Sequence, residues 1–246
     1  MKNIKLIKQL VFDALFLALI FVFSYTPYLG YITVGPLSFT TIHILVLIGA
    51  ILFGYKRGAL YGLFFGISSL VVALQYPGTL NYFSLNPFIS ILPRVLFGLI
   101  SGAIFDLLRK TVSKKVFITL IFPLSGIFTL LHTILFFVAF YIFGVKDVFG
   151  ITTALGLGSL VETLNGTYGG LMAFIGAYMS IGCVCEILGA ALIVPSVYLA
   201  VNKKFKIGEV VTDQENKKYS LKFNLFTTLL IVVFAIISVI IVSLLG

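Results

Sequence analysis

The sequence predicts an all-α integral membrane protein. Of its 246 residues, 60% are hydrophobic and only 10% are charged, and 25 are phenylalanine. A chain of this size with a mean hydropathy of +1.17 lacks the polar residues that it would need to cover a water-exposed surface. The hydrophobic residues also fall into separate runs long enough to cross a bilayer as helices. These three observations exclude an ordinary soluble domain.

Seven apolar runs match the roughly 17 to 25 residues that a transmembrane helix needs, although the second and third are short. The predicted spans are residues 7–25, 40–53, 59–74, 87–107, 116–143, 171–201 and 223–245. The start of the chain resembles a signal peptide because Lys2, Lys5 and Lys8 precede an apolar core. However, Asp13 opens its apolar core and no small-x-small cleavage site follows, so we expect a retained first helix.

The connections between these spans predict how the chain lies in the membrane. Lys and Arg favour cytoplasmic connections, and they gather in the segments 2–8, 56–57, 109–115 and 203–222. The alternate connections are residues 24–39, 75–86 and 144–170. Together they contain one basic residue, Lys146. We therefore expect a cytoplasmic N-terminus. The net charge of +9 then reflects basic clusters beside anionic lipid headgroups and indicates no nucleic-acid partner.

Glycines recur at four-residue spacing in and beside the third and fourth spans. They are Gly54, Gly58, Gly62, Gly66, Gly98 and Gly102. Small residues on one helical face allow two helix backbones to approach closely, which favours helix association in lipid. We expect these glycines to pack helices and to bind no ligand.

Four polar side chains within or at the start of the spans are the main candidates for a binding site: His43, Arg94, His132 and Glu186. A charge at mid-bilayer costs about 2.5 to 3.5 kcal/mol, so such residues usually face the bundle interior. Two interpretations remain open. Arg94 and Glu186 form an ion pair that locks two helices, or Arg94 binds an anionic ligand that Glu186 or His132 orients.

The predicted outer loops are long and rich in Tyr, Gly, Pro and Asn, as loops that cover a small-molecule site often are. Four tyrosines from these loops are candidates to cover a flat ring such as riboflavin: Tyr25, Tyr28, Tyr31 and Tyr82. Asn86 and Asn165, from the same loops, complete the candidate substrate-binding set.

Signatures of catalysis are absent from the sequence. There is no His-Glu-x-x-His zinc helix, no Gly-x-Ser-x-Gly elbow and no Gly-x-x-x-x-Gly-Lys-Ser/Thr phosphate loop. We expect no enzymatic activity, no cofactor and no metal site. Uphill movement of a solute would need an ion gradient or another subunit.

Three segments carry a resemblance to a known family: "TTIHILVLIGAILFGYKRGALYGLFFGISSL", "NPFISILPRVLFGLISG" and "CEILGAALIVPSVYLAVNKK". Their order and spacing resemble the S components of energy-coupling factor (ECF) vitamin transporters, and most closely the group that includes pantothenate-binding members. The resemblance extends from the first helix to about residue 204.

This resemblance implies a six-helix S-component domain over residues 1–204, in a bacterial cell membrane, that binds one vitamin beneath the loop between helices 1 and 2. It implies a transmembrane coupling subunit and two ATP-binding-cassette ATPases as partners. The family docks on the coupling subunit through a small-x-x-x-small motif in helix 1, which Ala14 and Ala18 match. Two features depart from the family pattern, a charged cytoplasmic linker at 205–224 and an additional transmembrane helix at 225–246.

The leading hypothesis is therefore a substrate-binding subunit of an ATP-driven importer. Pantothenate is the first candidate because Arg94 favours a carboxylate, and folate and riboflavin remain open. The alternative from another class is a self-sufficient, gradient-driven carrier or channel that uses Arg94, His132 and Glu186 as an ion relay. A membrane enzyme of unrecognised chemistry is a third, weaker interpretation.

Overall fold

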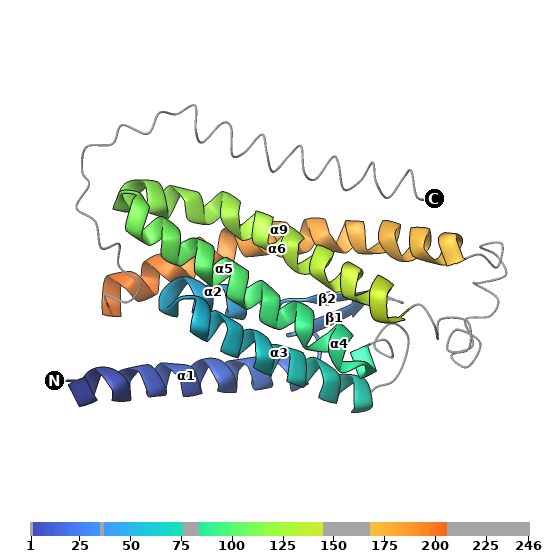
Figure 1. The fold of residues 1–246 in the computed structure, drawn as a ribbon, viewed down its shortest axis with the longest axis horizontal. Helices are drawn as coiled ribbons and strands as arrows, with labels where there is room; N and C mark the ends of the chain where they lie inside the picture. The colour runs from blue at the N-terminus through green and yellow to red at the C-terminus, as the bar shows by residue number, and fades with distance from the viewer. Residues whose placement is uncertain (1, 35–36, 76–83, 145–167, 206–246) are drawn as a thin grey trace.

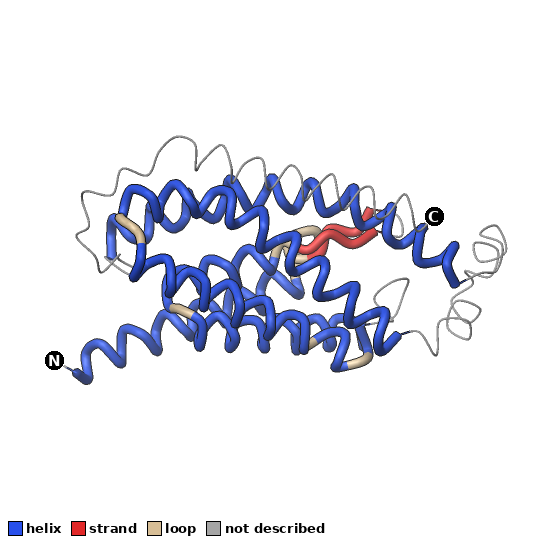
Figure 2. Tube along the Cα trace, turned by 45° about the horizontal axis from the view of Figure 1, so that its top comes forward, coloured by secondary structure: helices blue, strands red, loops and turns tan. Residues whose placement is uncertain are grey.

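The structure is a computed structural model that describes residues 2–34, 37–75, 84–144 and 168–205. Long helices run lengthwise beside one another, and a small β-hairpin lies among them (Figures 1 and 2). The elements are α1 (Lys2–Tyr25), β1 (Tyr31–Val34), β2 (Leu37–Thr40), α2 (Ile42–Phe53), α3 (Tyr55–Gln75), α4 (Pro87–Ser90), α5 (Leu92–Thr111), α6 (Lys114–Gly144) and α9 (Tyr168–Phe205).

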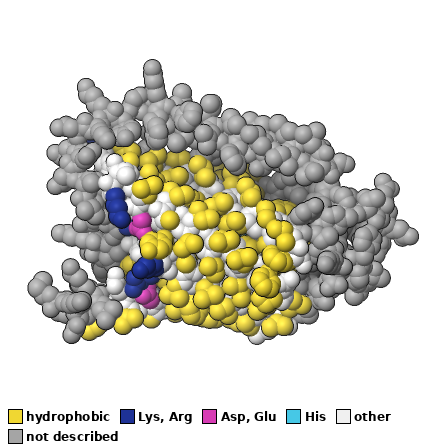
Figure 3. All heavy atoms as spheres, viewed as in Figure 1, with side chains coloured by type: hydrophobic (Ala, Val, Ile, Leu, Met, Phe, Trp, Pro, Cys, Tyr) yellow, Lys and Arg dark blue, Asp and Glu magenta, His cyan; other side chains and the backbone are white. Residues whose placement is uncertain are grey.

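Four helical stretches among the described residues are long and apolar enough to cross a membrane. They are Tyr55–Gln75, Pro87–Thr111, Lys114–Phe140 and Cys183–Lys203. The described surface visible in Figure 3 is mostly hydrophobic, with charged side chains gathered toward the end at which Figure 1 marks the N-terminus. These observations confirm the prediction of an all-α, multi-pass membrane protein.

The predicted spans differ from the described helices by up to five residues at their ends, and two of them also differ in how the chain is organised. The span predicted to start at residue 40 starts as a helix at Ile42, and the preceding residues form an antiparallel hairpin in which Tyr31 faces Thr40. The span predicted over 87–107 is divided at Ile91 into α4 and α5. The predicted linker at 205–224 falls almost entirely outside the described residues, and the additional helix at 225–246 wholly outside them, so both stay predictions.

The glycines of α3 and α5 allow the two helices to pack closely, as their spacing predicted. A Cβ added to Gly98 would overlap the carbonyl of Gly58, and one added to Gly62 would overlap the carbonyl of Arg94. Such backbone-to-backbone contact needs small residues on the facing surfaces. The α3–α5 contact is the most extensive one between described helices. It positions the α5 backbone at Arg94.

A largely aromatic core fills the space between α2, α3, α5 and α6. Tyr61, Phe65, Phe97 and Phe105 are fully buried there. Helix α1 lies along one edge of the bundle (Figure 1), where it contacts α2 and α3. The hairpin packs through β2 against α9.

Candidate functional site

Four helices bring the four intramembrane candidates into one cluster, in which Glu186 is partly buried and the other three are buried. His43 is on α2, Arg94 on α5, His132 on α6 and Glu186 on α9. His43 and His132 stack with ring centroids 5.4 Å apart, and Arg94 and His132 both pack against the ring of Phe65. His43, Arg94 and His132 are 0%, 5% and 4% exposed. We call His43, Arg94, His132 and Glu186 the polar cluster.

The backbone of the α4–α5 junction holds Arg94 in place. In a continuous helix the carbonyl of Ile89 would accept the N–H of residue 93, but residue 93 is proline and has none. Instead, Arg94 Nη1 donates to the Ile89 oxygen at 2.5 Å. The proline therefore leaves an acceptor free, and the next residue in the chain satisfies it.

Two aromatic rings also contact the guanidinium group. The Cζ atom of Arg94 lies 4.8 Å from the ring centroid of Phe136 and 5.4 Å from that of Phe65. Cation–π contacts of this kind stabilise a desolvated cation. However, Arg94 Nε is buried and has no hydrogen-bond partner among the described residues. A charged donor thus stays unsatisfied at the centre of the bundle.

The two histidines also leave buried nitrogen atoms unpaired. Thr129 Oγ1 lies 3.4 Å from His43 Nε2. His43 Nδ1 and both ring nitrogens of His132 have no partner within the described part of the chain. A buried polar atom without a hydrogen bond costs about 1 to 3 kcal/mol, and native proteins seldom leave several of them side by side. The polar cluster therefore has the hydrogen-bonding capacity to take up a polar ligand.

Glu186 connects the polar cluster to the hairpin. Its Oε1 atom accepts the backbone N–H of Thr40, the last residue of β2, at 2.6 Å. The other strand contributes Tyr31, whose buried hydroxyl oxygen has no hydrogen-bond partner among the described residues. Burial raises the pKa of Tyr31 above its usual value of 10.0, so its hydroxyl keeps its proton near neutral pH. The hairpin thus contacts the cluster through the Glu186 carboxylate, and the Tyr31 hydroxyl lies near Ser68, Ser69 and Arg94.

Arg94 and Glu186 do not form an ion pair. The ion pairs among the described residues join Asp13 to Arg57 and Asp106 to Arg109. Of the two interpretations that the sequence left open, the geometry therefore does not support a helix-locking Arg94–Glu186 bridge. Among the described residues, Arg94 therefore has no carboxylate within ion-pair distance.

Three members of the polar cluster also have the donor types of a metal site, although the sequence predicted none. The candidate ligand atoms of His43, His132 and Glu186 all lie within 4.8 Å of one another. Imidazole and carboxylate ligands suit Zn²⁺ and related transition metals. The neighbouring guanidinium of Arg94 would repel a cation placed there.

The other predicted binding residues do not join the polar cluster within the described structure. Asn86 is the N-cap of α4, and its side chain accepts the N–H of Phe88. Tyr28 is 75% exposed and has a φ of 61°. Tyr82 and Asn165 lie outside the described residues, so their assignment to the site stays a prediction.

Sequence reasoning did not assign Thr129, Phe65 or Phe136 to the site. Thr129 precedes His132 by three positions and therefore shares its helical face. Two polar residues on one face of an otherwise apolar span could have indicated that Thr129 belongs to the site. No such signal exists for the two phenylalanines. The chain contains 25 phenylalanines, and no local sequence pattern distinguishes one that contacts a guanidinium from one in the core.

Ala14 and Ala18 lie on the outer face of α1, where both are exposed. Leu15 and Val22, which are 50% and 55% exposed, flank them. The inner face of α1 carries the buried residues Phe16, Ile20 and Ser24. The two alanines therefore do not pack inside the described bundle.

Comparisons with known protein families and curated proteins relate this chain to a transporter family and to a curated protein. Residues 8–245 match the family model described as ECF transporter, substrate-specific component. A protein named Pantothenate transporter PanT, from Leuconostoc mesenteroides, is 39% identical over 104 residues. That alignment covers 40% of this chain and 51% of the relative, so it spans about half of the relative's length.

Proposed function

This chain belongs to the family of substrate-specific components of ECF transporters, and from that premise we propose that it captures a B vitamin for an ATP-driven importer, with pantothenate as the first candidate. As a member of this family it is a transport subunit and not an enzyme. ATP hydrolysis would be carried out by partner ATPases. We further propose that it resides in a bacterial cell membrane with its N-terminus in the cytoplasm, as the basic connections favour.

The observation that carries the substrate class is the buried guanidinium of Arg94, whose Nε atom has no hydrogen-bond partner among the described residues. Its side chain is buried, it has no carboxylate partner among the described residues, and its Nε atom is unpaired. A ligand carboxylate would supply the missing charge and accept charge-assisted hydrogen bonds from the guanidinium. The substrate we propose is therefore a small anion.

The remaining groups of the polar cluster suit a ligand that also bears hydroxyl or amide groups. His43 Nδ1 and the two nitrogens of His132 provide unpaired donors or acceptors, and the Tyr31 hydroxyl adds a donor from the hairpin. Pantothenate combines one carboxylate with two hydroxyls and an amide. The name of the relative that resembles part of this chain supports the same choice.

A thermal-shift panel on the purified full-length chain tests this proposal. Pantothenate, folate, riboflavin and other B vitamins are added one at a time, and the unfolding temperature is measured. We expect pantothenate to stabilise the protein, because a ligand at 100 times its Kd adds about 2.7 kcal/mol to the free energy of unfolding. Pantothenol, in which the carboxylate is replaced by an alcohol, is the matched control and should stabilise much less.

Each other outcome has a defined meaning. Equal stabilisation by pantothenate and pantothenol would contradict the role of the carboxylate. Stabilisation by folate or riboflavin alone would change the substrate, and stabilisation by Zn²⁺ alone would favour the metal site. Uphill uptake by vesicles that contain only this chain would favour a self-sufficient carrier and overturn the assignment to an ATP-driven importer.

We propose that α1 docks on a transmembrane coupling subunit, which in turn carries two ATP-binding-cassette ATPases. Ala14 and Ala18 are exposed one turn apart on the outer face of α1. Their small side chains would allow a partner helix to approach closely. The polar cluster lies on other helices, so this proposed docking face and the proposed ligand site can be tested separately.

The variant in which Ala14 and Ala18 are both replaced by Trp should lose transport and complex assembly but keep its vitamin affinity. Two indoles would fill the groove between the helices and prevent close approach. Co-purification with the coupling subunit measures assembly, and ligand titration in detergent measures affinity. The matched control is Ala103→Trp, a replacement at an exposed position of α5, which should assemble normally. Normal co-purification of the double variant would show that the partner docks elsewhere.

A further inference from the structure

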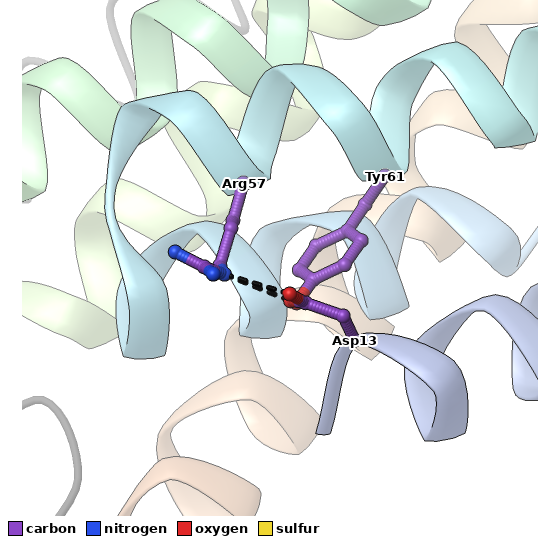
Figure 4. Close-up of polar contacts among 3 residues, drawn as sticks. All are labelled: Asp13, Arg57 and Tyr61. Atoms are coloured by element: carbon purple, nitrogen blue, oxygen red, sulfur yellow. Dashed lines mark hydrogen bonds and ion pairs between the residues drawn. The ribbon is translucent and has the colours of Figure 1, made fainter. Parts of the chain in front are cut away.

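A charged side chain that does not belong to the polar cluster connects the edge helix α1 to α3. Asp13 is the only charged residue among positions 9–25, and it faces Arg57 and Tyr61 of α3 (Figure 4). Arg57 Nε lies 2.9 and 3.0 Å from the two carboxylate oxygens, and the Tyr61 hydroxyl donates to Oδ1 at 2.5 Å. The Asp13 side chain is only 13% exposed. We call Asp13, Arg57 and Tyr61 the α1 clamp.

The tyrosine of the α1 clamp is held firmly by its neighbours. Tyr61 is 0% exposed, and its ring stacks on Phe16 at a centroid distance of 5.1 Å and an interplanar angle of 16°. A Cβ on Gly49 of α2 would overlap this ring, so a glycine there provides the space that the ring occupies. Because the ring cannot shift, its hydroxyl marks a fixed position for the carboxylate of Asp13.

A second polar contact joins the same two helices nearer the hairpin. Ser24 donates to Ser68 at 2.8 Å. At 3.6 residues per turn, Asp13 and Ser24 lie about three turns apart on the same face of α1. Apart from aromatic pairs such as Phe16 and Tyr61, the apolar contacts between them have little directional preference, whereas hydrogen bonds are directional. The two polar contacts therefore fix both the rotation of α1 and its position along its axis.

The rotation of α1 determines where its outer face points. Ala14 is about 100° around the helix from Asp13, and Ala18 is about 140° around it. We infer that the α1 clamp is a positioning device, which orients the Ala14 and Ala18 face for the coupling subunit. This inference rests on the proposed function. Asp13, Arg57 and Tyr61 act through the alanine face and need not touch the partner.

The test is the substitution Asp13→Asn in the full-length chain. It keeps the side-chain shape but removes the negative charge to which Arg57 and Tyr61 donate hydrogen bonds. We expect the apparent affinity for the coupling subunit with its ATPases to fall about tenfold, with vitamin affinity unchanged. In the chain alone, hydrogen exchange of the α1 amides should become faster while that of α5 and α6 stays the same. Arg57→Gln should behave similarly, and the double variant should lose little more, because the two residues act together.

A control separates positioning from general loss of stability. Phe105→Leu disturbs the packing of Phe105, on α5, against Phe117 and Phe128, which are both on α6. It should lower the unfolding temperature without weakening assembly as Asp13→Asn does. Equal effects of the two variants on assembly, or unchanged hydrogen exchange in α1, would overturn the inference. A wild-type chain that binds the vitamin but never assembles would instead overturn the proposed partner, and the exchange data would still decide whether the clamp holds α1.

Discussion

Arg94→Ala should abolish pantothenate binding while the protein still folds. Removal of one partner from a buried, hydrogen-bonded charge pair costs about 2 to 5 kcal/mol, which corresponds to a loss of roughly 30-fold to several thousandfold in affinity. Folding should survive because Arg94 forms no ion pair with any described residue. The variant also removes a charge that is costly to place in the membrane. Ligand titration by calorimetry, together with the yield of monodisperse protein, measures both quantities.

Two further comparisons make this prediction specific. Arg94→Lys keeps the charge but loses the planar fork, so it should bind with intermediate affinity. Pantothenol should bind equally weakly to the wild type and to Arg94→Ala, because it lacks the carboxylate. The contrary result would be a misfolded Arg94→Ala whose folding and binding both return when Arg94→Leu is combined with Glu186→Leu. That rescue would make Arg94 a structural partner of Glu186.

Gly98→Ala should destabilise the protein despite the general preference of helices for alanine. In an exposed helix interior, Gly→Ala gains about 0.8 to 1 kcal/mol. At position 98 the new Cβ would overlap the carbonyl of Gly58, and forcing extra atoms into a packed interface costs about 1 to 3 kcal/mol or more. The two helices would have to separate where their backbones meet. A lower unfolding temperature in detergent is the expected measurement.

Gly189→Ala is the matched control for this effect. A Cβ there would meet only Ile44 Cδ1, at 4.0 Å, which is an ordinary van der Waals distance. We expect this variant to be as stable as the wild type or slightly more stable. Equal unfolding temperatures for Gly98→Ala and Gly189→Ala would show that the α3–α5 contact is looser than the structure indicates.

The parts of the fold that depend on local pattern could be predicted from the sequence. Apolar length locates the helices, and the four-residue spacing of Gly58, Gly62 and Gly66 indicates the face that packs. The hairpin was missed, although "YITV" and "LSFT" are rich in β-branched and aromatic residues on either side of a Gly-Pro pair. In a membrane protein that signal is easily overlooked beside the much stronger hydrophobic runs.

The candidate site was predictable only in part. Polar side chains in lipid must face the interior, which is enough to expect that His43, His132 and Glu186 converge. The same reasoning does not extend to loops, where water satisfies polar groups in any direction. Tyr28 is accordingly exposed, and Asn86 caps a helix. Which aromatic rings surround Arg94 depends on how α3, α5 and α6 are placed, and no spacing within one helix encodes that.

The bond between Arg94 and the Ile89 carbonyl has an evolutionary consequence. The guanidinium is held by a hydrogen bond to the main-chain carbonyl of Ile89, close to Pro93. Because this acceptor belongs to the main chain, substitution of the surrounding side chains does not remove it. A lineage could therefore replace the polar residues on α2, α6 and α9 one at a time, and so change which molecule fits, while the positive charge stays where it is. The proline and the arginine, in contrast, would have to be inherited together. Loss of Pro93 would give the Ile89 carbonyl an ordinary helical donor and release the guanidinium from its anchor.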